Sequence, residues 1–410
     1  MPHILDQLDP TVLGQKLKQA RTARGLRQED VAKKLGIVRT TLIAIEQGSR
    51  RVTARELAEM STLYGRPMSE WLAEEPAPVP LVPQFRLPSS QMRLTEADVQ
   101  SAVSNLESLA RDYLALEQIN EMPLVRRYPA VYQHEAPGVS PESCGEEVAA
   151  TERTRLGLGD GPILDLRSLM EESLGLRIFY YDLPATMGGL YAYSEDLGGC
   201  IGINRRHPAP RAVWSLAHEC GHFLTTRFLA DVSLWDDEPW GKSSAERFAD
   251  SFAKNFLMPR AGVNRVLTEF VRAHGKGVTV ADVMTLAHQF RVSAEAMFRR
   301  LEELKRLPSG TWDKLRAQKF QPDKARVALG LLAAENPEPT LPFRYRMLTM
   351  WAYDVREALT EGQLADYLRM DRVAARHELE RLRAMADQQS DDGFEPLDVQ
   401  PEPERILVPA

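Results

Sequence analysis

Residues 215–224 read SLAHECGHFL and place His218 and His222 four positions apart within an apolar run. Residues at this spacing lie one helical turn apart on the same face, so both imidazoles can reach one metal ion. Glu219 lies beside that face, where its carboxylate can take a proton from a zinc-activated water and pass it to a leaving amine. The pattern therefore predicts a catalytic zinc helix, although a structural zinc or a metal-free buried helix would show the same letters.

A catalytic zinc normally has a third protein ligand and one open position, so the chain must supply another donor. The metzincin class has Gly at position 225 and takes its third ligand from a His at position 228. Thr225 and Phe228 occupy these positions and exclude that class. Further along, residues 243–259 read SSAERFADSFAKNFLMP, a second amphipathic pattern. Glu246 can complete a His-His-Glu site, and Asp250, one turn later, can accept the remaining N–H of a ligand histidine.

These two segments resemble the ImmA/IrrE family of zinc metallopeptidases, whose pattern the chain follows over roughly residues 145–310. Three more stretches carry the resemblance: LGDGPILDLRSLMEESLGLRIFYYDLP at 158–184, GCIGINRRHPAPRA at 199–212 and VTVADVMTLAHQFRVSAEAMFRRLEEL at 278–304. The resemblance implies an α+β zincin-like fold and a peptidase of narrow specificity that cleaves XRE-type repressors. It also implies one Zn2+ per chain, with these roles: ligands His218, His222 and Glu246, catalytic base Glu219, and supporting carboxylate Asp250.

Two features of this region are not fixed by the motif. Cys220 stands where the family usually has an aliphatic residue, and its place nearly opposite His218 on the helix predicts that it faces the core. A peptidase of this kind also needs a group that stabilises the oxyanion. Tyr191, Tyr193 and His207 lie near the motif in sequence, and the sequence does not choose between them.

A basic module precedes this region. Between Leu13 and Arg66 the chain has 12 Lys and Arg against five Asp and Glu, a net charge of +7, so the remaining residues carry −14. A basic module on an acidic body is typical of nucleic-acid contact, although a solvated charged surface gives the same count. Apolar residues at helical spacing, interrupted at Gly25, Gly36 and Gly48, predict three helices, of which the second and third form a helix-turn-helix.

Residues 11–73 resemble the XRE/Cro family of repressors, through the run GLRQEDVAKKLGIVRTTLIAIEQGSRRVTARELAEMSTLYGRPMSEWL. The resemblance implies a five-helix domain that binds a double-stranded DNA operator, often as a dimer with half-sites one turn apart. The alternative is a five-helix domain kept for protein contacts. The residues that the resemblance places on DNA are, at phosphates, Gln28, Arg50 and Arg51, and, at base edges in the major groove, Val38, Arg39, Thr40 and Ala44.

The rest of the chain divides by composition. Residues 74–90 contain five prolines and predict a stiff spacer. A helix after Thr95 carries a narrow apolar stripe that either packs on its own domain or forms a dimer arm, namely Ala102, Leu106, Leu109, Tyr113 and Leu116. Near the end, LTEGQLADYLRMDRVAARHELERL at 359–382 faintly resembles a second helix-turn-helix, but packing onto the peptidase is favoured.

The sequence therefore predicts a multidomain, mainly α fold. Its predicted parts are a five-helix helix-turn-helix domain at 1–75, a Pro-rich linker at 76–93, a linking helix at 94–123, the α+β peptidase domain at 140–310, a helical C-terminal domain at 311–386 and a disordered tail at 387–410.

Composition limits the function classes. The chain has 410 residues, 43% of them hydrophobic and 27% charged, as in ordinary globular proteins. Its first residues, MPHILDQLDP, lack the pattern of a signal peptide, and no apolar run approaches the 18 residues or so of a membrane span. Three scattered cysteines, Cys144, Cys200 and Cys220, argue against a disulfide framework. We therefore expect a cytoplasmic protein without membrane partners.

Together these expectations describe a bacterial regulator of stress or mobile-element genes that joins DNA binding to a zinc-dependent endopeptidase. The rival interpretation is a transcription factor whose peptidase-like domain senses a ligand or metal and does not cut. The intact set of His218, Glu219, His222 and Glu246 favours the enzyme, because a sensor has no need of a general base.

Overall fold

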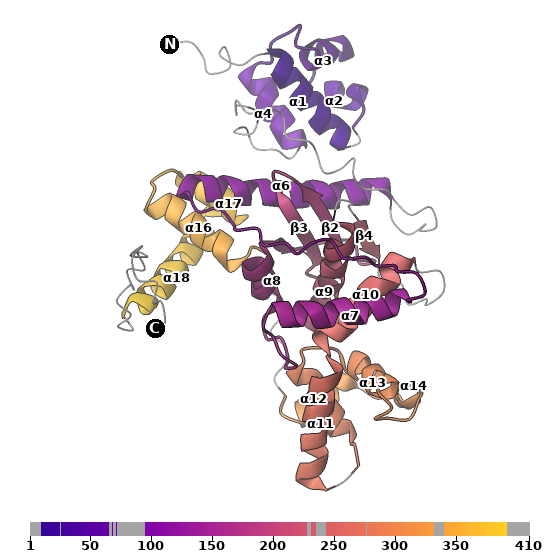
Figure 1. The fold of residues 1–410 in the computed structure, drawn as a ribbon. Coiled ribbons are helices and arrows are strands. Elements are labelled where there is room, and N and C mark those ends of the chain that lie inside the picture. Colours follow the sequence, from indigo (N-terminus) through magenta and orange to yellow (C-terminus); the bar gives the residue numbers. More distant parts are fainter. Residues whose placement is uncertain are drawn as a thin grey trace, which may run out of the picture. The chain divides into compact units, whose positions relative to one another are not determined.

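The computed structural model describes residues 10–24, 26–64, 68, 71, 95–227, 231–234, 243–275, 277–331 and 340–391 (Figure 1). It is mainly helical with one small mixed sheet, which confirms the predicted fold class. The chain divides into two compact units, a larger one of residues 1–111 and 124–340 and a smaller one of residues 112–123 and 341–410. Among the described helices, none is both long enough and apolar enough to cross a membrane.

Four labelled helices form the N-terminal domain: α1 (Pro10–Ala23), α2 (Gln28–Lys34), α3 (Arg39–Glu46) and α4 (Ala54–Tyr64). The turn between α2 and α3 passes through Gly36, whose φ of 65° lies in the left-handed region that favours glycine. The Ile37 N–H then donates to the Ala32 carbonyl at 3.0 Å and closes the turn. Of the predicted fifth helix, the described residues include Met68 and Trp71, and Trp71 is buried in the core of this domain.

A buried ion pair holds the first three helices together. Arg21 of α1 donates to both carboxylate oxygens of Glu46 of α3, at 2.5 and 3.0 Å. The Arg21 guanidinium also bonds the Leu26 carbonyl, and the Gln28 amide of α2 donates to Glu46 at 2.9 Å. The Glu46 side chain is only 2% exposed, so its charge depends on these partners for stabilisation.

We therefore expect Glu46→Ala to destabilise the N-terminal domain by about 3–5 kcal/mol, because the Arg21 charge would stay buried without its partner. Hydrogen–deuterium exchange of the full-length chain measures this as faster exchange in α1 and α3, with no change in the peptides of residues 209–257. Glu59→Ala serves as control, since Glu59 pairs with Arg55 at the surface. Equal protection of α1 and α3 in both variants would contradict the assignment.

A four-stranded sheet with the order β1-β3-β2-β4 lies in the larger unit. Its strands are β1 (Arg177–Tyr181), β2 (Met187–Ser194), β3 (Gly198–Asn204) and β4 (Asp231–Leu234), and the β1–β3 pair alone is parallel. Every residue of β1 and β3 is buried, as expected of strands covered on both faces. The Asn204 amide ends β3 and donates to the carbonyls of Pro184 and Met187, which fixes the loop between β1 and β2.

Helices surround this sheet and share one hydrophobic core with it: α7 (Pro141–Arg155), α8 (Leu166–Leu174), α9 (Ala209–Thr226) and α10 (Ser244–Leu257). The α9 helix packs against β2 and β3, and α10 packs between α9 and α7. On α10, the rings of Phe248, Phe252 and Phe256 stack in succession and are fully buried. This apolar stripe faces inward and fixes how α10 lies against its neighbours.

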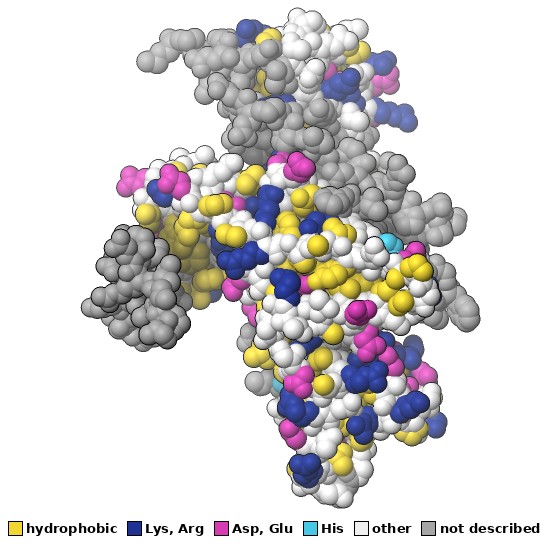
Figure 2. All heavy atoms as spheres, in the orientation of Figure 1, with side chains coloured by type: hydrophobic (Ala, Val, Ile, Leu, Met, Phe, Trp, Pro, Cys, Tyr) yellow, Lys and Arg dark blue, Asp and Glu magenta, His cyan; other side chains and the backbone are white. Residues whose placement is uncertain are grey.

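The same core continues through α11 (Arg260–His274), α12 (Val280–Gln289), α13 (Ala294–Glu303), α14 (Thr311–Ala317) and α15 (Pro322–Ala328). Trp312 of α14 packs on Phe298 of α13, with ring centroids 5.5 Å apart. Leu331, the last described residue before position 340, still contacts this core. The core therefore extends past residue 310, the predicted end of the peptidase domain. On the face shown in Figure 2, charged side chains of both signs are scattered over this helical region.

The smaller unit joins the last turns of α6 (Glu96–Asn120) to α16 (Phe343–Asp354), α17 (Glu361–Leu368) and α18 (Arg372–Asp391). Tyr113 and Tyr345 meet edge to face at 5.3 Å, and the Asn120 amide donates to the Leu348 carbonyl at 3.0 Å. Arg346 of α16 pairs with Glu378 of α18 at 2.8 Å. These contacts make the unit a small helical bundle.

Three predicted segments meet different outcomes. The predicted linker at 76–93 lies outside the described residues. The apolar stripe of α6 is buried within the single chain, so it offers no exposed dimer face. The α18 helix ends at Asp391, four residues after the predicted start of the tail at 387, and residues 392–410 lie outside the described residues.

Candidate metal and catalytic site

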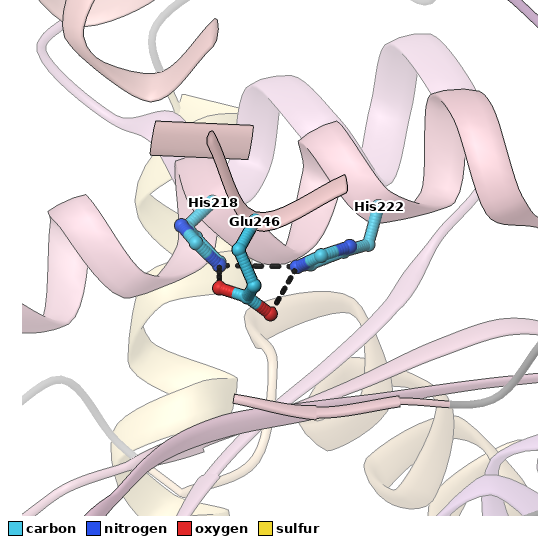
Figure 3. Close-up of side chains that lie close together, drawn as sticks. All are labelled: His218, His222 and Glu246. Atoms are coloured by element: carbon cyan, nitrogen blue, oxygen red, sulfur yellow. Dashed lines mark hydrogen bonds and ion pairs between the residues drawn. The ribbon is translucent and has the colours of Figure 1, made fainter. Parts of the chain in front are cut away.

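The α9 helix carries the two histidines predicted as metal ligands. Pro208 and Pro210 fit its first turn, where a missing N–H is harmless, and the following residues keep helical spacing. His218 and His222 therefore project from the same face, and their Nε2 atoms lie 3.0 Å apart (Figure 3). Both side chains are nearly fully buried.

The α10 helix brings Glu246 to the same point. Ser243 caps this helix by accepting the Glu246 N–H at 3.2 Å, so the glutamate lies in the first turn, where the helix dipole favours a carboxylate. Its oxygens lie 3.2 Å from His218 Nε2 and 3.3 Å from His222 Nε2. The ligand atoms of the three residues all lie within 4.8 Å of one another (Figure 3). Among the described residues, this is the grouping that could hold a metal ion.

Small residues allow α9 and α10 to approach this closely. A Cβ atom at Gly221 would lie 3.1 Å from Ala249 Cα and 3.3 Å from the Phe252 ring, tighter than ordinary contact. On the other side of α10, a Cβ at Gly145 of α7 would lie 2.7 Å from the Phe248 carbonyl oxygen. The α10 helix is thus held between two glycine contacts, and one of these glycines, Gly221, lies in the chain between the two candidate ligands His218 and His222.

Two buried arginines hold the other end of α10. The Arg153 guanidinium bonds the Phe256 carbonyl, and Arg300 donates to the Met258 carbonyl at 3.1 Å and to Asn255 Oδ1 at 2.7 Å. These donors satisfy carbonyls that the last turn of a helix leaves unbonded, and their charge favours that end of the dipole. Burial lowers the pKa of both arginines, Arg153 to about 10.

Asp250 supports His218 from behind. Its Oδ1 lies 3.0 Å from His218 Nδ1, so this contact directs His218 Nε2 toward Glu246 and His222. Burial disfavours a charged imidazole, but the hydrogen bonds to Asp250 and Glu246 outweigh it and raise the pKa of His218 to about 10. The pKa of Glu246 is lowered, since the two histidines overcome the effect of its burial. The acidic and basic groups of the site thus lie in mutual contact.

We expect Asp250→Ala to reduce zinc affinity about 10- to 100-fold, the usual effect of losing the partner of a ligand histidine. Titration against a zinc chelator on the full-length chain measures this. Arg247→Ala is the matched control, because Arg247 lies on the exposed side of the same helix. If both variants bind zinc like the unmodified chain, Asp250 does not orient a ligand.

Glu219, the predicted catalytic base, lies on α9 next to the ligands and is fully buried. It packs against Gly189 of β2, where a Cβ atom would lie 2.8 Å from Glu219 Oε1. The glycine therefore leaves the space that the carboxylate occupies. The Glu219 carboxylate lies between α9 and strand β2. Any side chain at position 189 would therefore displace it.

Two of the three residues considered for the oxyanion role are engaged in the fold. The Tyr191 hydroxyl donates to the Arg227 carbonyl, and burial raises its pKa well above the ordinary value. His207 Nε2 lies 3.0 Å from the Ala185 carbonyl, and burial lowers the pKa of this histidine. Tyr193 packs its ring edge-on against Tyr128.

Sequence reasoning missed the supporting roles of Gly145, Gly189 and Asn204. Asn204 could have been noticed, because it ends the IGIN stretch immediately before α9. The two glycines give no local signal, since each is required by a neighbour far away in the chain. Cys220 is buried on the core side of α9, with its sulfur 3.4 Å from Met170 Sδ, as its position predicts.

The predicted DNA-contact residues lie at the start of α2, on and just before α3, and in the segment after α3. Val38, Arg39 and Thr40 are exposed at the start of α3, and Ala44 is half-buried one turn later. The Gln28 amide, predicted to bond a phosphate, donates to Glu46 within the domain. Arg50 pairs with Glu56 at 3.0 Å and Arg51 is exposed.

Comparison with known proteins gives two family matches. Residues 171–302 match the family model of the IrrE N-terminal-like domain, a peptidase family, and residues 12–71 match a helix-turn-helix domain. No curated protein matches the chain. Among solved structures, the chain is similar to the crystal structure of Bacillus thuringiensis PlcR in complex with the peptide PapR7 and DNA, at 8% identity over 93% of this chain and 97% of that one. Its TM-score of 0.16 is too low to support an argument.

Both matched ranges fall where the sequence places the two motifs, and the predicted fusion is thereby confirmed. The helix-turn-helix match supports DNA binding, and the other match supports a metallopeptidase-like domain around α9 and α10. The chain thus joins a helix-turn-helix domain and an IrrE-like metallopeptidase-type domain in one polypeptide.

Proposed function

We propose that this chain is a DNA-binding regulator whose second domain is a zinc-dependent endopeptidase. The proposed substrate is an XRE-type repressor, whose cleavage would release stress or mobile-element genes. The observation that carries the proposal is the convergence of His218, His222 and Glu246, with Glu219 buried beside them.

The donor set fits zinc. Two imidazole nitrogens and one carboxylate oxygen are the ligands of many catalytic zinc sites. Donors about 2.0–2.1 Å from a tetrahedral zinc lie about 3.3–3.4 Å apart. The three separations between ligand atoms here are 3.0, 3.2 and 3.3 Å. Zinc could therefore be held with little movement of the two helices.

The mechanism follows from the positions of the chain's own groups. When bound, zinc supplies a Lewis acid that polarises the scissile carbonyl and makes a nearby water more acidic. Glu219 takes a proton from the attacking water and gives it to the leaving amide nitrogen, so the carboxylate ends the cycle unprotonated. Asp250 keeps His218 oriented, and Gly189 leaves space for the base.

The substrate class rests on the family resemblance and on the chain's own N-terminal domain. A peptidase that recognises XRE-type folds would find such a fold in a neighbouring repressor or in a second copy of this chain. The N-terminal domain would bring the peptidase to operators where such repressors bind. A dimer on DNA is part of the proposal, and its contacts must come from a surface other than the buried stripe of α6.

The first test measures metal and cleavage together. We expect about one zinc per chain, a loss of zinc in His222→Ala and Glu246→Ala, and retained zinc without cleavage in Glu219→Gln. Metal analysis measures the zinc content of the unmodified chain and of the three variants. Incubation with repressors encoded beside its gene, followed by mass spectrometry, measures the loss of cleavage in Glu219→Gln.

Gly189→Ala adds a variant that leaves all metal ligands intact. Its new Cβ would displace the Glu219 carboxylate, so cleavage should fall while zinc content stays unchanged. Gly161→Ala is the control, because a Cβ there meets open space. Full zinc in His222→Ala would overturn the ligand set. Zinc binding without any cleavage by the unmodified chain would favour the metal-sensing regulator instead.

The second test concerns DNA. We expect Arg39→Ala to weaken binding to the specific operator by about 1–3 kcal/mol, and much less on random DNA, if Arg39 reads a base edge. Binding should also weaken steeply with salt, because each neutralised phosphate releases counterions. Fluorescence anisotropy at several salt concentrations measures both effects.

Arg55→Ala is a suitable control, since it removes one exposed charge of the same domain away from α3. Equal losses for Arg39→Ala on specific and random DNA would mean that Arg39 contacts the backbone only.

A further inference from the structure

The turn that joins α2 and α3 recurs between α14 and α15, where Lys319 is left-handed and the Phe320 N–H donates to the Leu315 carbonyl. With a buried alanine as the acceptor, it recurs between two further pairs of described helices. Between α12 and α13 it passes through Arg291, and between α17 and α18 through Arg369, with φ values of 54° and 55° beside 65° at Gly36. A non-glycine residue adopts this conformation only when the surrounding fold holds it there. The three pairs therefore share one backbone device.

The hydrogen bond that closes the turn is also the same. Two residues before the second helix, a backbone N–H donates to the carbonyl of a buried alanine five positions earlier. The three bonds are Ile37 to Ala32 at 3.0 Å, Val292 to Ala287 at 3.0 Å and Met370 to Ala365 at 3.1 Å. Aligning these alanines sets the register for the helices that follow.

In this register the buried positions of the first and third pairs coincide. Val31, Leu42 and Glu46 correspond to Leu364, Ala375 and Leu379, and all six are buried. Each second helix thus has buried side chains at two shared positions, although Ile45 is buried where the aligned Glu378 is half-buried.

The exposed faces correspond as well. Arg39, the proposed base-reading residue, aligns with Arg372, and both are exposed at the first position of their helix. Thr40 aligns with Val373, which is 63% exposed, and Ala44 aligns with His377. The α12–α13 pair differs, because Ala294 takes the place of Arg39 and is buried in the core. The α12–α13 pair is therefore structural, whereas the α17–α18 pair keeps a free face.

We propose that α17 and α18 form a second DNA-binding element, which inserts the start of α18 into a major groove with Arg372 at a base edge. This goes beyond the function proposed above, which assigns DNA contact to the N-terminal domain alone. DNA is the partner that fits this face because Arg372, Arg376 and His377 are exposed on the first two turns of α18. The positive end of the helix dipole also lies there.

An ion pair across the turn is common to both elements. Arg39 lies 3.4 Å from Glu29 of α2, and Arg376 donates to Glu361 of α17 at 2.6 Å. Both pairs are largely exposed, and such pairs contribute little to stability. DNA can therefore replace the carboxylate in either element, with a base edge at Arg39 and a phosphate at Arg376.

The test uses the full-length chain and DNA that it selects from random duplexes of about 40 base pairs, long enough for more than one contact site. We expect Arg372→Ala to weaken binding about tenfold or more, and to uncover a part of the footprint that Arg39→Ala leaves protected. Arg372→Lys should keep part of the affinity but lose sequence preference, because lysine lacks the bidentate fork. Arg272→Ala, which removes an exposed charge on α11, should change neither affinity nor footprint.

Affinity and footprint unchanged in Arg372→Ala would overturn this proposal. If Arg39→Ala alone abolishes binding, the N-terminal reader stands and the second element fails. If Arg372→Ala instead lowers the sedimentation mass of the DNA-free chain, the face binds a second copy and the proposal is also overturned. Since Arg372 is exposed, circular dichroism should show that the variant is folded like the unmodified chain.

Discussion

The candidate site depends on how closely two helices can approach. The histidines of α9 and the glutamate of α10 are separated in the chain by 24 residues, from His222 to Glu246, and converge because α9 carries no side chain at Gly221. Helices packed through larger residues lie farther apart, typically at axial distances of 8–10 Å set by the contact residues. A larger residue at position 221 would move the Glu246 carboxylate away from the two imidazoles, although all three candidate ligands would still be present.

The rest of the larger unit keeps α10 in that place. Gly145 lets α7 pack against its outer side, the stacked phenylalanines fill the core below it, and Arg153 and Arg300 bond the carbonyls at its end. Buried arginines are rare unless their donors are satisfied, and here backbone carbonyls satisfy many of them. These contacts hold α10 independently of the three candidate ligands, so they limit the reorganisation that metal binding would require.

One backbone turn serves different purposes along the chain. At Gly36 it orients a helix whose first residue, Arg39, is exposed, and at Arg291 it orients a helix whose first residue, Ala294, is buried in the peptidase-like core. The turn itself is the same because a left-handed residue and one hydrogen bond to a buried alanine are enough to redirect the chain. What the second helix does is decided by the side chains on the face that the packing leaves free.

The sequence by itself determined the fold class, the two family motifs and the position of the metal-ligand pattern on a helix. These follow from local rules, since helical periodicity places residues 218 and 222 on one face of their helix, and residues 246 and 250 on one face of a second helix. Tertiary packing decided everything that depends on distant residues. It turned Gln28 toward Glu46, buried the stripe of α6 within one chain, and carried the peptidase core past residue 310 to Leu331. It also joined residues 112–123 to the C-terminal helices. The physical reason is that an apolar stripe fixes which face of a helix is buried, but the partner that covers it is chosen by the shape and charge of segments far away in the chain.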